Sequence, residues 1–525
     1  MATAPLALPR LRKMLSDTDD TNILDLFWGV HALQNDNVDG ARRVIKYPPE
    51  AANADIMSRF AVHPWDVETV LTLNMNTAKA SGPGRRPLPT DQFNAAGELI
   101  NTLRTAREQD TAGRIRADNI TLEMHRVSHR QFAWQRGWAN KIDIFRYLYI
   151  YGQGACADYF HQTYGLTISD FFGVALAAFQ MHSERPWLEM IYGTEAVLGI
   201  TDDAVQRAYG LLSQEIWSGR RSAKALREKF EASLGASLPV IYYPSFLRVK
   251  PIVKVFTARK NVYIAPLPQL IMHRATIGLF FDLVPGGTAI TNDANARFEE
   301  YARRAIEGYC PAFEAAPAVK YTFSGNPVDT PDILMKRNGV VQTVFECKAT
   351  KLTFEAQYGD DPVQNAKNGY AQMAKAIFQL WKFFSHVRRG ILAADVADDT
   401  TGVVLTIEPW TQMSSELRDR LVQDASDLAA SKDPGITDLD KRRPVFCTIE
   451  ELEDVIREAT EDQLLATFRS AMEDRFNGWS IREVRKEVAP EKTTLKPHPF
   501  DFGDLLPWWD AVEEYGRNRA EAETG

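Results

Sequence analysis

An acid and a lysine stand two positions apart at the end of an apolar run, VFECKATKL, which spans 344–352. Successive side chains of a β-strand point to opposite faces, so Glu346 and Lys348 share one face. Phe345 and Cys347 share the other face, which is apolar. A surface ion pair on an edge strand would explain the pattern and would contribute little to stability. The alternative is a catalytic carboxylate beside a catalytic ammonium.

A second carboxylate, Asp332, lies at the start of the preceding strand. The pair Asn338-Gly339 separates DILMK from VVQTVFECK, which is a strong hairpin signal because both residues accept a positive φ. A plain two-residue turn would place Asp332 opposite Phe345, on the apolar face. One bulge, or a three-residue loop, would bring Asp332 opposite Glu346 instead. We therefore predict a bulge or a longer loop in this hairpin.

With that register, Asp332, Glu346 and Lys348 converge on one face. Two carboxylates at short range repel, which raises one pKa or demands a cation. Hard oxygen ligands with a free coordination sphere suit Mg²⁺, or Mn²⁺, which keep waters and bind phosphate oxygens. A lysine beside them can position or activate a water and offset charge that builds up on the phosphate. The chemistry implied is metal-assisted hydrolysis of a phosphodiester.

The motif formed by these residues resembles a known signature. Pro331-Asp332, followed after thirteen residues by Glu346-Cys347-Lys348, is similar to the signature of the PD-(D/E)XK nuclease superfamily. The expected element order of helix, hairpin, helix, strand and helix also resembles its restriction-endonuclease-like core, over roughly residues 290–460. The resemblance implies that Asp332 and Glu346 are metal ligands, that the Cys347 carbonyl is a third ligand, and that Lys348 is the catalytic lysine.

The same resemblance implies polar residues on the two flanking helices. The helix before the hairpin contains RFEEY, which offers Glu299 and Glu300. Glu299 directly follows a phenylalanine expected in the core, and we prefer it to Glu300. On the helix after the hairpin, Gln372 and Gln379 share one face, and Gln379 is favoured. Asp329 is the competing acid if Asp332 proves misplaced.

The chain around the motif divides into four segments by pattern. Residues 1–236 are mainly helical, because apolar residues recur at spacings of three and four. Residues 237–290 are rich in β-branched and aromatic residues, which predicts a strand-rich connector. Residues 291–485 alternate strands with helices, which predicts an α/β nuclease-like domain with a mixed sheet. Residues 486–525 form a tail that covers a surface or frays.

Charge limits the kind of partner that the chain can hold. With 525 residues the chain is too long for one hydrophobic core. Its net charge of −8 argues against a protein surface that is basic throughout. A nucleic acid would have to be held by a local patch. One acid-free run within the connector is a candidate phosphate-facing patch or, equally, a solvated face: Arg248, Lys250, Lys254, Arg259 and Lys260.

Other signals are weaker or negative. The four cysteines are widely separated, without a C-x-x-C, which indicates reduced, buried thiols and a cytoplasmic location. The longest apolar run, 171–179, is far short of the roughly 20 residues of a membrane span, and the N-terminus lacks a secretory pattern. His125 and His129 have a metal-ligand spacing, but no third ligand is evident and neighbouring arginines favour a solvated face.

The sequence thus predicts a Mg²⁺-dependent nuclease, with DNA as the leading substrate because DNA is the commonest substrate of the superfamily. RNA, including transfer RNA, is the first alternative. A role in bacterial anti-phage defence follows only by analogy of architecture. A homodimer, and a protein partner or trigger acting through the helical region, are compatible with this architecture. The hypothesis of a different class is a non-catalytic module that keeps the nuclease fold to bind nucleic acid or protein.

Overall fold

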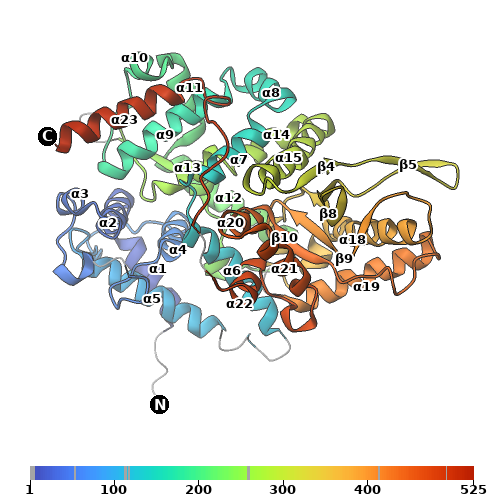
Figure 1. Cartoon of the computed structure of the whole chain (residues 1–525). Coiled ribbons are helices and arrows are strands. Elements are labelled where there is room, and N and C mark those ends of the chain that lie inside the picture. Colours follow the sequence, from blue (N-terminus) through green and yellow to red (C-terminus); the bar gives the residue numbers. More distant parts are fainter. Residues whose placement is uncertain are drawn as a thin grey trace. The chain divides into compact units, whose positions relative to one another are not determined.

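The chain forms two compact units in the computed structural model (Figure 1). The helical unit comprises residues 1–117, 130–287 and 502–525, and the sheet unit comprises residues 118–129 and 288–501. The structure describes these residues: 6–52, 55–111, 115, 119–256, 261–411, 414–491 and 494–524. The units differ from the predicted division, because 237–287 belongs with the helices and 118–129 belongs with the sheet.

The helical unit is built around helices that are buried on every side. All residues of α4 from Trp65 to Met75, and all residues of α7 from Ile142 to Tyr151, are buried. Their buried acids are paired within the unit, as when Asp66 accepts from Arg104 and Arg130. Such pairing offsets the cost of removing charges from water. The mainly helical N-terminal region that the sequence predicts is confirmed.

The elements of the helical unit, apart from α6, are these: α1 (Ala7–Asp17), α2 (Asp20–Leu33), α3 (Val38–Arg42), η1 (Pro49–Ala52), α4 (Pro64–Met75), α5 (Phe93–Thr111), α7 (Lys141–Tyr151), α8 (Gly154–Tyr164), α9 (Ile168–Glu184), α10 (Thr194–Leu198), α11 (Asp202–Leu212), β1 (Ser213–Glu215), α12 (Ile216–Leu234), η2 (Val240–Tyr242), η3 (Phe246–Arg248), β2 (Ile252–Phe256), β3 (Asn261–Ile264), α13 (Gln269–Ala275), α14 (Leu279–Leu283), η4 (Val284–Gly286) and α23 (Trp509–Thr524). Helix α6 (Ile120–Arg136) contributes residues to both units.

The prediction of a strand-rich connector is wrong for most of its length. Among the connector residues that the structure describes, only β2 and β3 are strands, and with β1 they form a small sheet of order β1-β2-β3. The 3-10 turns η2 and η3 precede them, and the helices α13 and α14 follow. Pro239, Pro244 and Pro251 punctuate the first half of the segment, and a proline cannot donate to a strand ladder. Its apolar residues are buried in turns and short helices instead.

The sheet unit is built on a mixed five-stranded sheet of order β10-β9-β8-β7-β4. Strand β7 runs antiparallel to both β4 and β8, whereas β8, β9 and β10 run parallel to one another. The predicted mixed sheet is therefore confirmed. The elements of the unit are β4 (Glu314–Pro317), β5 (Lys320–Phe323), β6 (Asn326–Asp329), β7 (Ile333–Arg337), β8 (Val340–Lys348), β9 (Val396–Thr406), β10 (Val445–Thr448), α15 (Thr288–Tyr309), α16 (Phe354–Tyr358), α17 (Pro362–Asn365), α18 (Lys367–Arg388), α19 (Ser415–Lys432), α20 (Ile449–Glu458), α21 (Glu461–Ala471), η5 (Asp474–Phe476) and α22 (Ile481–Val488).

Helices cover both faces of this sheet. On one face Val344 and Val404 pack into a core with Leu380 and Trp381 of α18, and α19 lies beside α18. On the other face Phe345 contacts Phe468 of α21 edge-on. Adjacent residues of β8 therefore point into different layers, as strand alternation requires. This places Glu346, which follows Phe345, on the α18 side of the sheet.

The hairpin between β7 and β8 contains the predicted bulge. Asn338 and Gly339 both have positive φ, 53° and 82°, and Arg337 lies opposite Val340, so the turn has two residues. The register then shifts between Met335 and Lys336. After the shift Ile333 lies opposite Phe345, and continuing this register by one step aligns Asp332 with Glu346. The bulge prediction is confirmed, and the site register follows from it.

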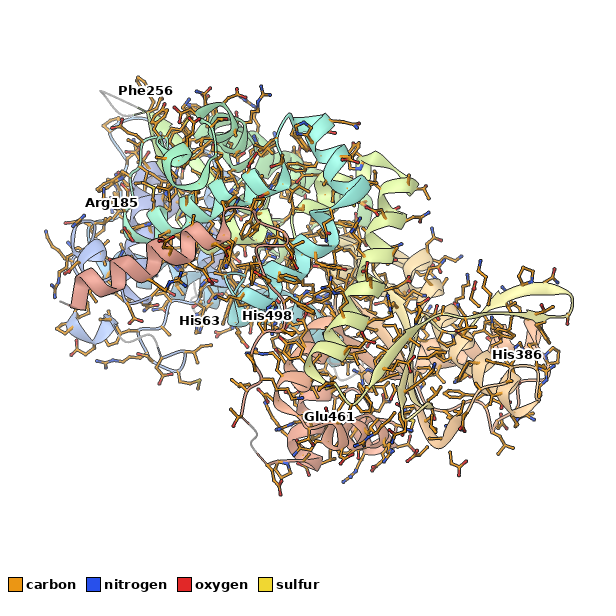
Figure 2. All side chains as sticks on the ribbon, turned by 45° about the horizontal axis from the view of Figure 1, so that its top comes forward. His63, Arg185, Phe256, His386, Glu461 and His498 are labelled. Carbon is orange, nitrogen blue, oxygen red and sulfur yellow. The ribbon has the colours of Figure 1, made fainter. Side chains whose placement is uncertain are left out.

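A two-stranded ribbon between β4 and β7 was not predicted. Strands β5 and β6 pair with each other outside the five-stranded sheet, and we call residues 318–330 the arm (Figure 1). Tyr321 and Phe323 both contact His386 of α18, which Figure 2 labels beside the arm. The opposite face of the arm, with Lys320 and Thr322, is exposed. The sequence missed these strands because each has only four residues, most of them exposed.

The C-terminal tail packs against its surroundings. Phe502, Leu506, Trp508 and Trp509 are buried in the helical unit, and α23 follows them. Aromatic residues of this size bury a large apolar area, which holds the segment in place. None of the helices in the described part of the chain is long and apolar enough to cross a membrane.

Candidate functional site

A second bulge positions Asp332. Beyond the last β4–β7 pair, the hairpin continues into the arm, where Thr330 N donates to Val319 O over 3.0 Å. Between those two points a single residue, Ala318, faces two residues, Pro331 and Asp332. An extra residue of this kind bends a strand and re-aims its side chain. Proline suits the position because it has no amide hydrogen to place in the ladder.

Backbone and side-chain hydrogen bonds tie the three motif residues together. The Asp332 Oδ2 atom accepts from the Cys347 amide over 2.7 Å. The Lys348 Nζ atom donates to Glu346 Oε1 over 2.7 Å and to the Cys347 carbonyl over 3.0 Å. The structure therefore brings together the two carboxylates, the carbonyl and the ammonium that the motif predicted.

The helix acid of the cluster is Glu299. Its neighbour Phe298 is fully buried in the stripe of α15, as predicted, and Glu299 itself is half-buried. The pKa of Glu299 is raised to about 7, first by burial and then by the Asp332 carboxylate, while Lys348 opposes the rise. Glu299 is thus close enough to interact with both residues. Of the two acids that the sequence offered on this helix, Glu299 is the one that acts on the cluster.

The acids of the cluster are buried or partly buried, and Lys348 alone does not balance their negative charge. Glu346 is only 2% exposed, and burial raises its pKa to about 7 although Lys348 lowers it. Burial likewise raises the pKa of Asp332, against the effect of Lys348. Burial lowers the pKa of Lys348, but the Glu346 and Asp332 carboxylates outweigh it and hold that pKa above its usual value. Lys348 is therefore a permanent cation that balances only part of the negative charge.

One oxygen atom of Glu346 is left without a partner. The Oε2 atom is buried and accepts no hydrogen bond, which is costly for a carboxylate. A divalent cation would satisfy it, and Asp332 and the Cys347 carbonyl supply further hard oxygen donors. Within the described residues no three histidine, cysteine or acidic side chains group closely enough to hold a metal by themselves. The donor set therefore fits a cation that also uses a backbone carbonyl and waters.

The Cys347 thiol is buried close to the acids of the cluster. It is 6% exposed, and burial raises the pKa of its thiol well above the usual range. A thiol of that kind is inert as a nucleophile. All four cysteines are buried, as the sequence predicted.

Helix α18 brings a lysine to the cluster that the sequence interpretation missed. Burial lowers the pKa of Lys382, while Glu346 and Asp329 raise it, so this ammonium lies within electrostatic reach of both carboxylates. Gln379, the favoured residue, is half-buried one turn earlier, and Gln372 is exposed. Lys382 follows Gln379 by three positions and shares its helix face, so the spacing could have made it a further candidate but could not have singled it out.

Asp329 does not replace Asp332. It lies at the end of β6, is exposed, and acts on Asp332 and Lys382 only through its charge. Asp332 has the hydrogen bond to β8 that fixes its carboxylate in place.

The histidine pair of α6 is buried rather than solvated. His125 is fully buried, its neighbour Arg126 is 6% exposed, and Arg126 pairs with Glu123 and Asp360. The rings of His125 and His129 lie edge-on, 4.4 Å apart. Burial, and then the charge of His125, hold the pKa of His129 well below its usual range. The expectation of a solvated face is wrong, because the arginines are neutralised inside the protein.

Two of the three described residues of the connector's basic run are bound within the protein. The Arg248 guanidinium pairs with Glu68 over 2.7 Å, and Lys250 donates to the Gly210 carbonyl over 2.6 Å. Their donors are therefore used within the helical unit. The remaining members are Lys254, which lies 4.0 Å from Glu215, and Arg259 and Lys260, which lie outside the described residues.

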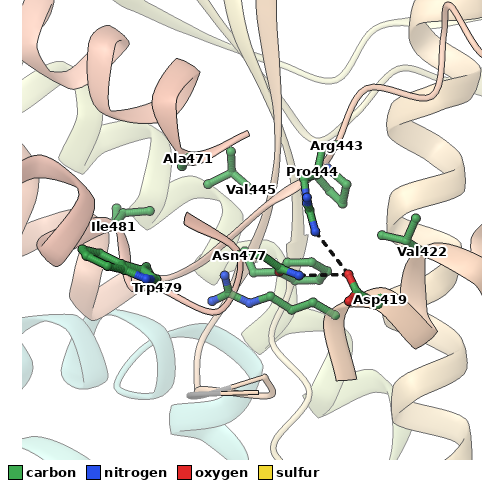
Figure 3. Close-up of a pocket in the computed structure, with 11 residues that line it drawn as sticks. Asp419, Val422, Arg443, Pro444, Val445, Ala471, Asn477, Trp479 and Ile481 are labelled. Atoms are coloured by element: carbon green, nitrogen blue, oxygen red, sulfur yellow. Dashed lines mark hydrogen bonds and ion pairs between the residues drawn. The ribbon is translucent and has the colours of Figure 1, made fainter. Parts of the chain in front are cut away.

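A small pocket of the sheet unit lies at the start of β10 (Figure 3). Trp479, Val445 and Ile481 line it, and its polar side is closed because Asp419 accepts from both Arg443 and Asn477. None of the residues that line it belongs to the acidic cluster. Chemistry therefore places the candidate site at the cluster and not at this pocket.

Comparison with protein-family models, with curated proteins and with solved structures found no match to this chain.

Proposed function

We propose that the sheet unit is a Mg²⁺-dependent nuclease of the PD-(D/E)XK kind, which can also use Mn²⁺. The observation that carries the proposal is the buried convergence of Asp332, Glu346 and Lys348, in which one Glu346 oxygen has no partner. The strand order and directions around β8 also resemble the core of that superfamily.

Asp332, Glu346 and the Cys347 carbonyl would hold the cation. When bound, a divalent cation polarises a phosphoryl oxygen and lowers the pKa of a water. The Lys348 ammonium remains protonated, so it orients the attacking water and stabilises charge on the phosphate instead of acting as a base. Glu299, with a pKa of about 7, is suited to exchange a proton at the edge of the site.

Duplex DNA is the leading substrate, because the resemblance favours it, and RNA, including transfer RNA, is the alternative. A defence role against phage, with the helical unit as the part that meets a protein trigger, rests on architecture alone. A homodimer would allow both strands of a duplex to be cut. The cytoplasm is the location in which the free buried thiols and a nucleic-acid substrate are both expected.

The test is degradation of plasmid DNA and of RNA by the full chain, with Mg²⁺ and with EDTA. We expect cleavage only with Mg²⁺, and a loss of about 100-fold or more in Asp332→Asn, Glu346→Gln and Lys348→Met. Glu299→Gln is expected to slow cleavage, while its matched control Glu300→Gln stays within about twofold. Cleavage that survives EDTA or these substitutions would overturn the site. Absence of cleavage on every substrate would favour a non-catalytic binding module.

A further inference from the structure

Helix α18 presents an acid-free polar face that ends at the cluster. Five of its residues recur at alternating spacings of four and three, so they share one face of the helix, and we call them the α18 stripe. They are Asn368, Gln372, Lys375, Gln379 and Lys382. The first three are exposed and the last two are half-buried, while the opposite face of α18 is in the core.

The stripe is chemically uniform. It contains only ammonium and amide groups, and the segment from Pro362 to Ala394 contains no aspartate or glutamate. This is unusual in a chain with 69 acidic residues and a net charge of −8. A polyanion can therefore approach this helix without meeting a carboxylate on the helix itself.

In the part of the chain that the structure describes, the lysines of the stripe have no close ion-pair partner. Within the described residues, Lys375 and Lys382 form no ion pair, whereas Arg388 and Arg389 at the end of the same helix pair with Asp440 and Asp433. A solvated helix face would explain unpaired lysines in general. It would not explain why the stripe leads to Lys382, which interacts with Glu346 and Asp329 at the cluster.

We propose that the α18 stripe binds the phosphodiester backbone of a nucleic-acid strand and leads it to the cluster, independently of base sequence. The stripe spans about 21 Å of helix, which matches the rise of about six base pairs. Ammonium and amide groups recognise phosphate oxygens and carry no base information of their own. The inference rests on the proposed function of the cluster at the end of β8, but its test measures the binding of nucleic acid and not its cleavage.

The experiment is fluorescence anisotropy with the full chain in EDTA, at KCl concentrations from 50 to 200 mM, values set by the salt range over which phosphate contacts are lost. The probes are labelled oligonucleotides of about 20 nucleotides, long enough to cover the stripe several times. Two unrelated base sequences are used, each as duplex DNA and as single-stranded RNA. We expect the double variant Lys375→Gln, Lys382→Gln to bind about tenfold more weakly or worse at the lowest salt. Its salt slope should fall by roughly 1.5–2, equally for both sequences.

Two controls separate the stripe from general charge. Lys432→Gln removes one charge from an exposed lysine of α19 and is expected to leave binding within about twofold. Lys375→Arg with Lys382→Arg keeps the charge and should restore binding. An unchanged salt slope in the glutamine variant would overturn the inference, even if the wild type cleaves nucleic acid. A wild type that binds labelled polyglutamate but neither nucleic acid would overturn it in favour of an acidic protein partner.

The two proposals fail separately. Loss of nucleic-acid binding in the glutamine variant of a protein that cleaves nothing would support the stripe and contradict the nuclease. Normal cleavage with unchanged binding would support the nuclease and contradict the stripe.

Discussion

The ion pair between Glu346 and Lys348 is expected to contribute little to the stability of the folded protein. The Glu346 side chain is 2% exposed and that of Lys348 is 15% exposed. Two charges buried to this extent lose more by leaving water than an ion pair usually returns. The pair also leaves Glu346 Oε2 without a partner. The arrangement is consistent with the proposed binding of a cation and an anionic substrate, and it offers little to the stability of the fold.

The Lys348 ammonium occupies two of the oxygen donors that a cation would use. It donates to Glu346 Oε1 and to the Cys347 carbonyl. We therefore expect Lys348→Met to bind Mn²⁺ as tightly as the wild type or more tightly, because a competing cation is removed. Glu346→Gln should bind it at least about tenfold more weakly.

Isothermal titration calorimetry at about pH 8, above the raised pKa of Glu346, measures both affinities, with Glu300→Gln as the matched acid outside the cluster. Equal Mn²⁺ affinities in Glu346→Gln and the wild type would contradict the ligand assignment.

At the scale of elements, β4, the arm and β7 form one continuous hairpin. The bulge at Pro331-Asp332 lies where the hairpin leaves the five-stranded sheet. The arm is fastened by Tyr321, whose hydroxyl lies 2.8 Å from Nδ1 of His386, while Nε2 of His386 lies 2.9 Å from Asp433. A tautomer with its hydrogen on Nε2 donates to Asp433 and accepts from Tyr321. Four-residue strands are only marginally stable alone, so the arm depends on this contact.

We expect Tyr321→Phe to loosen the arm. The substitution leaves Nδ1 of a fully buried histidine without a partner, at a cost of about 1–3 kcal/mol. Hydrogen exchange of the amides in residues 319–330 should accelerate, including that of Thr330, which donates to Val319. The control is Thr322→Val on the exposed face of the same strand, which should leave exchange unchanged. Identical exchange in Tyr321→Phe and the wild type would show that the contact does not hold the arm.

The sequence predicted the elements that have strong local signals. Asn338-Gly339 and the spacing to Glu346 were enough to predict the hairpin, its bulge and the partner of Asp332. The arm escaped prediction because its short strands are mostly exposed and its docking residue, His386, is 65 positions away from Tyr321. Lys382 was missed because only the tertiary packing of α18 on β8 shows which part of its polar face reaches the cluster. The prediction for the connector failed because its aromatic residues are buried in turns and short helices and do not lie in paired strands.

At the scale of the whole molecule, the negative net charge opposes the proposed binding of a nucleic acid. A chain with a charge of −8 repels a nucleic acid at long range, and this repulsion is screened as salt rises. In our proposal the α18 stripe supplies a local attraction that offsets this repulsion. Acidic groups also make the stability of the molecule depend on pH.

Asp25 in α2 provides a test of that dependence. Burial raises its pKa to about 6, although the indole of Trp187 donates to it and lowers the pKa. A folded-state pKa above the ordinary value means that the free energy of unfolding falls as pH rises between about 4 and 6. Asp25→Asn keeps an acceptor for Trp187 and removes this loss. We expect it to stabilise the protein by roughly 1–2 kcal/mol at neutral pH and by little at about pH 4.

Denaturant unfolding at the two pH values measures the difference. A gain of equal size at both would show that ionisation of Asp25 is not its cause.

The most direct test of the whole account compares rates of cleavage at equal metal occupancy. The measurement is single-turnover hydrolysis of one labelled DNA by the full-length wild type and by Lys348→Met, each saturated with Mg²⁺. In the proposed mechanism Lys348 stabilises charge on the phosphate and does not hold the metal. We therefore expect Lys348→Met to bind both metal and DNA yet to cleave about 100-fold more slowly or worse. Equal rates in the two proteins, or no hydrolysis by either on DNA or RNA, would contradict the assignment of this cluster as a nuclease site.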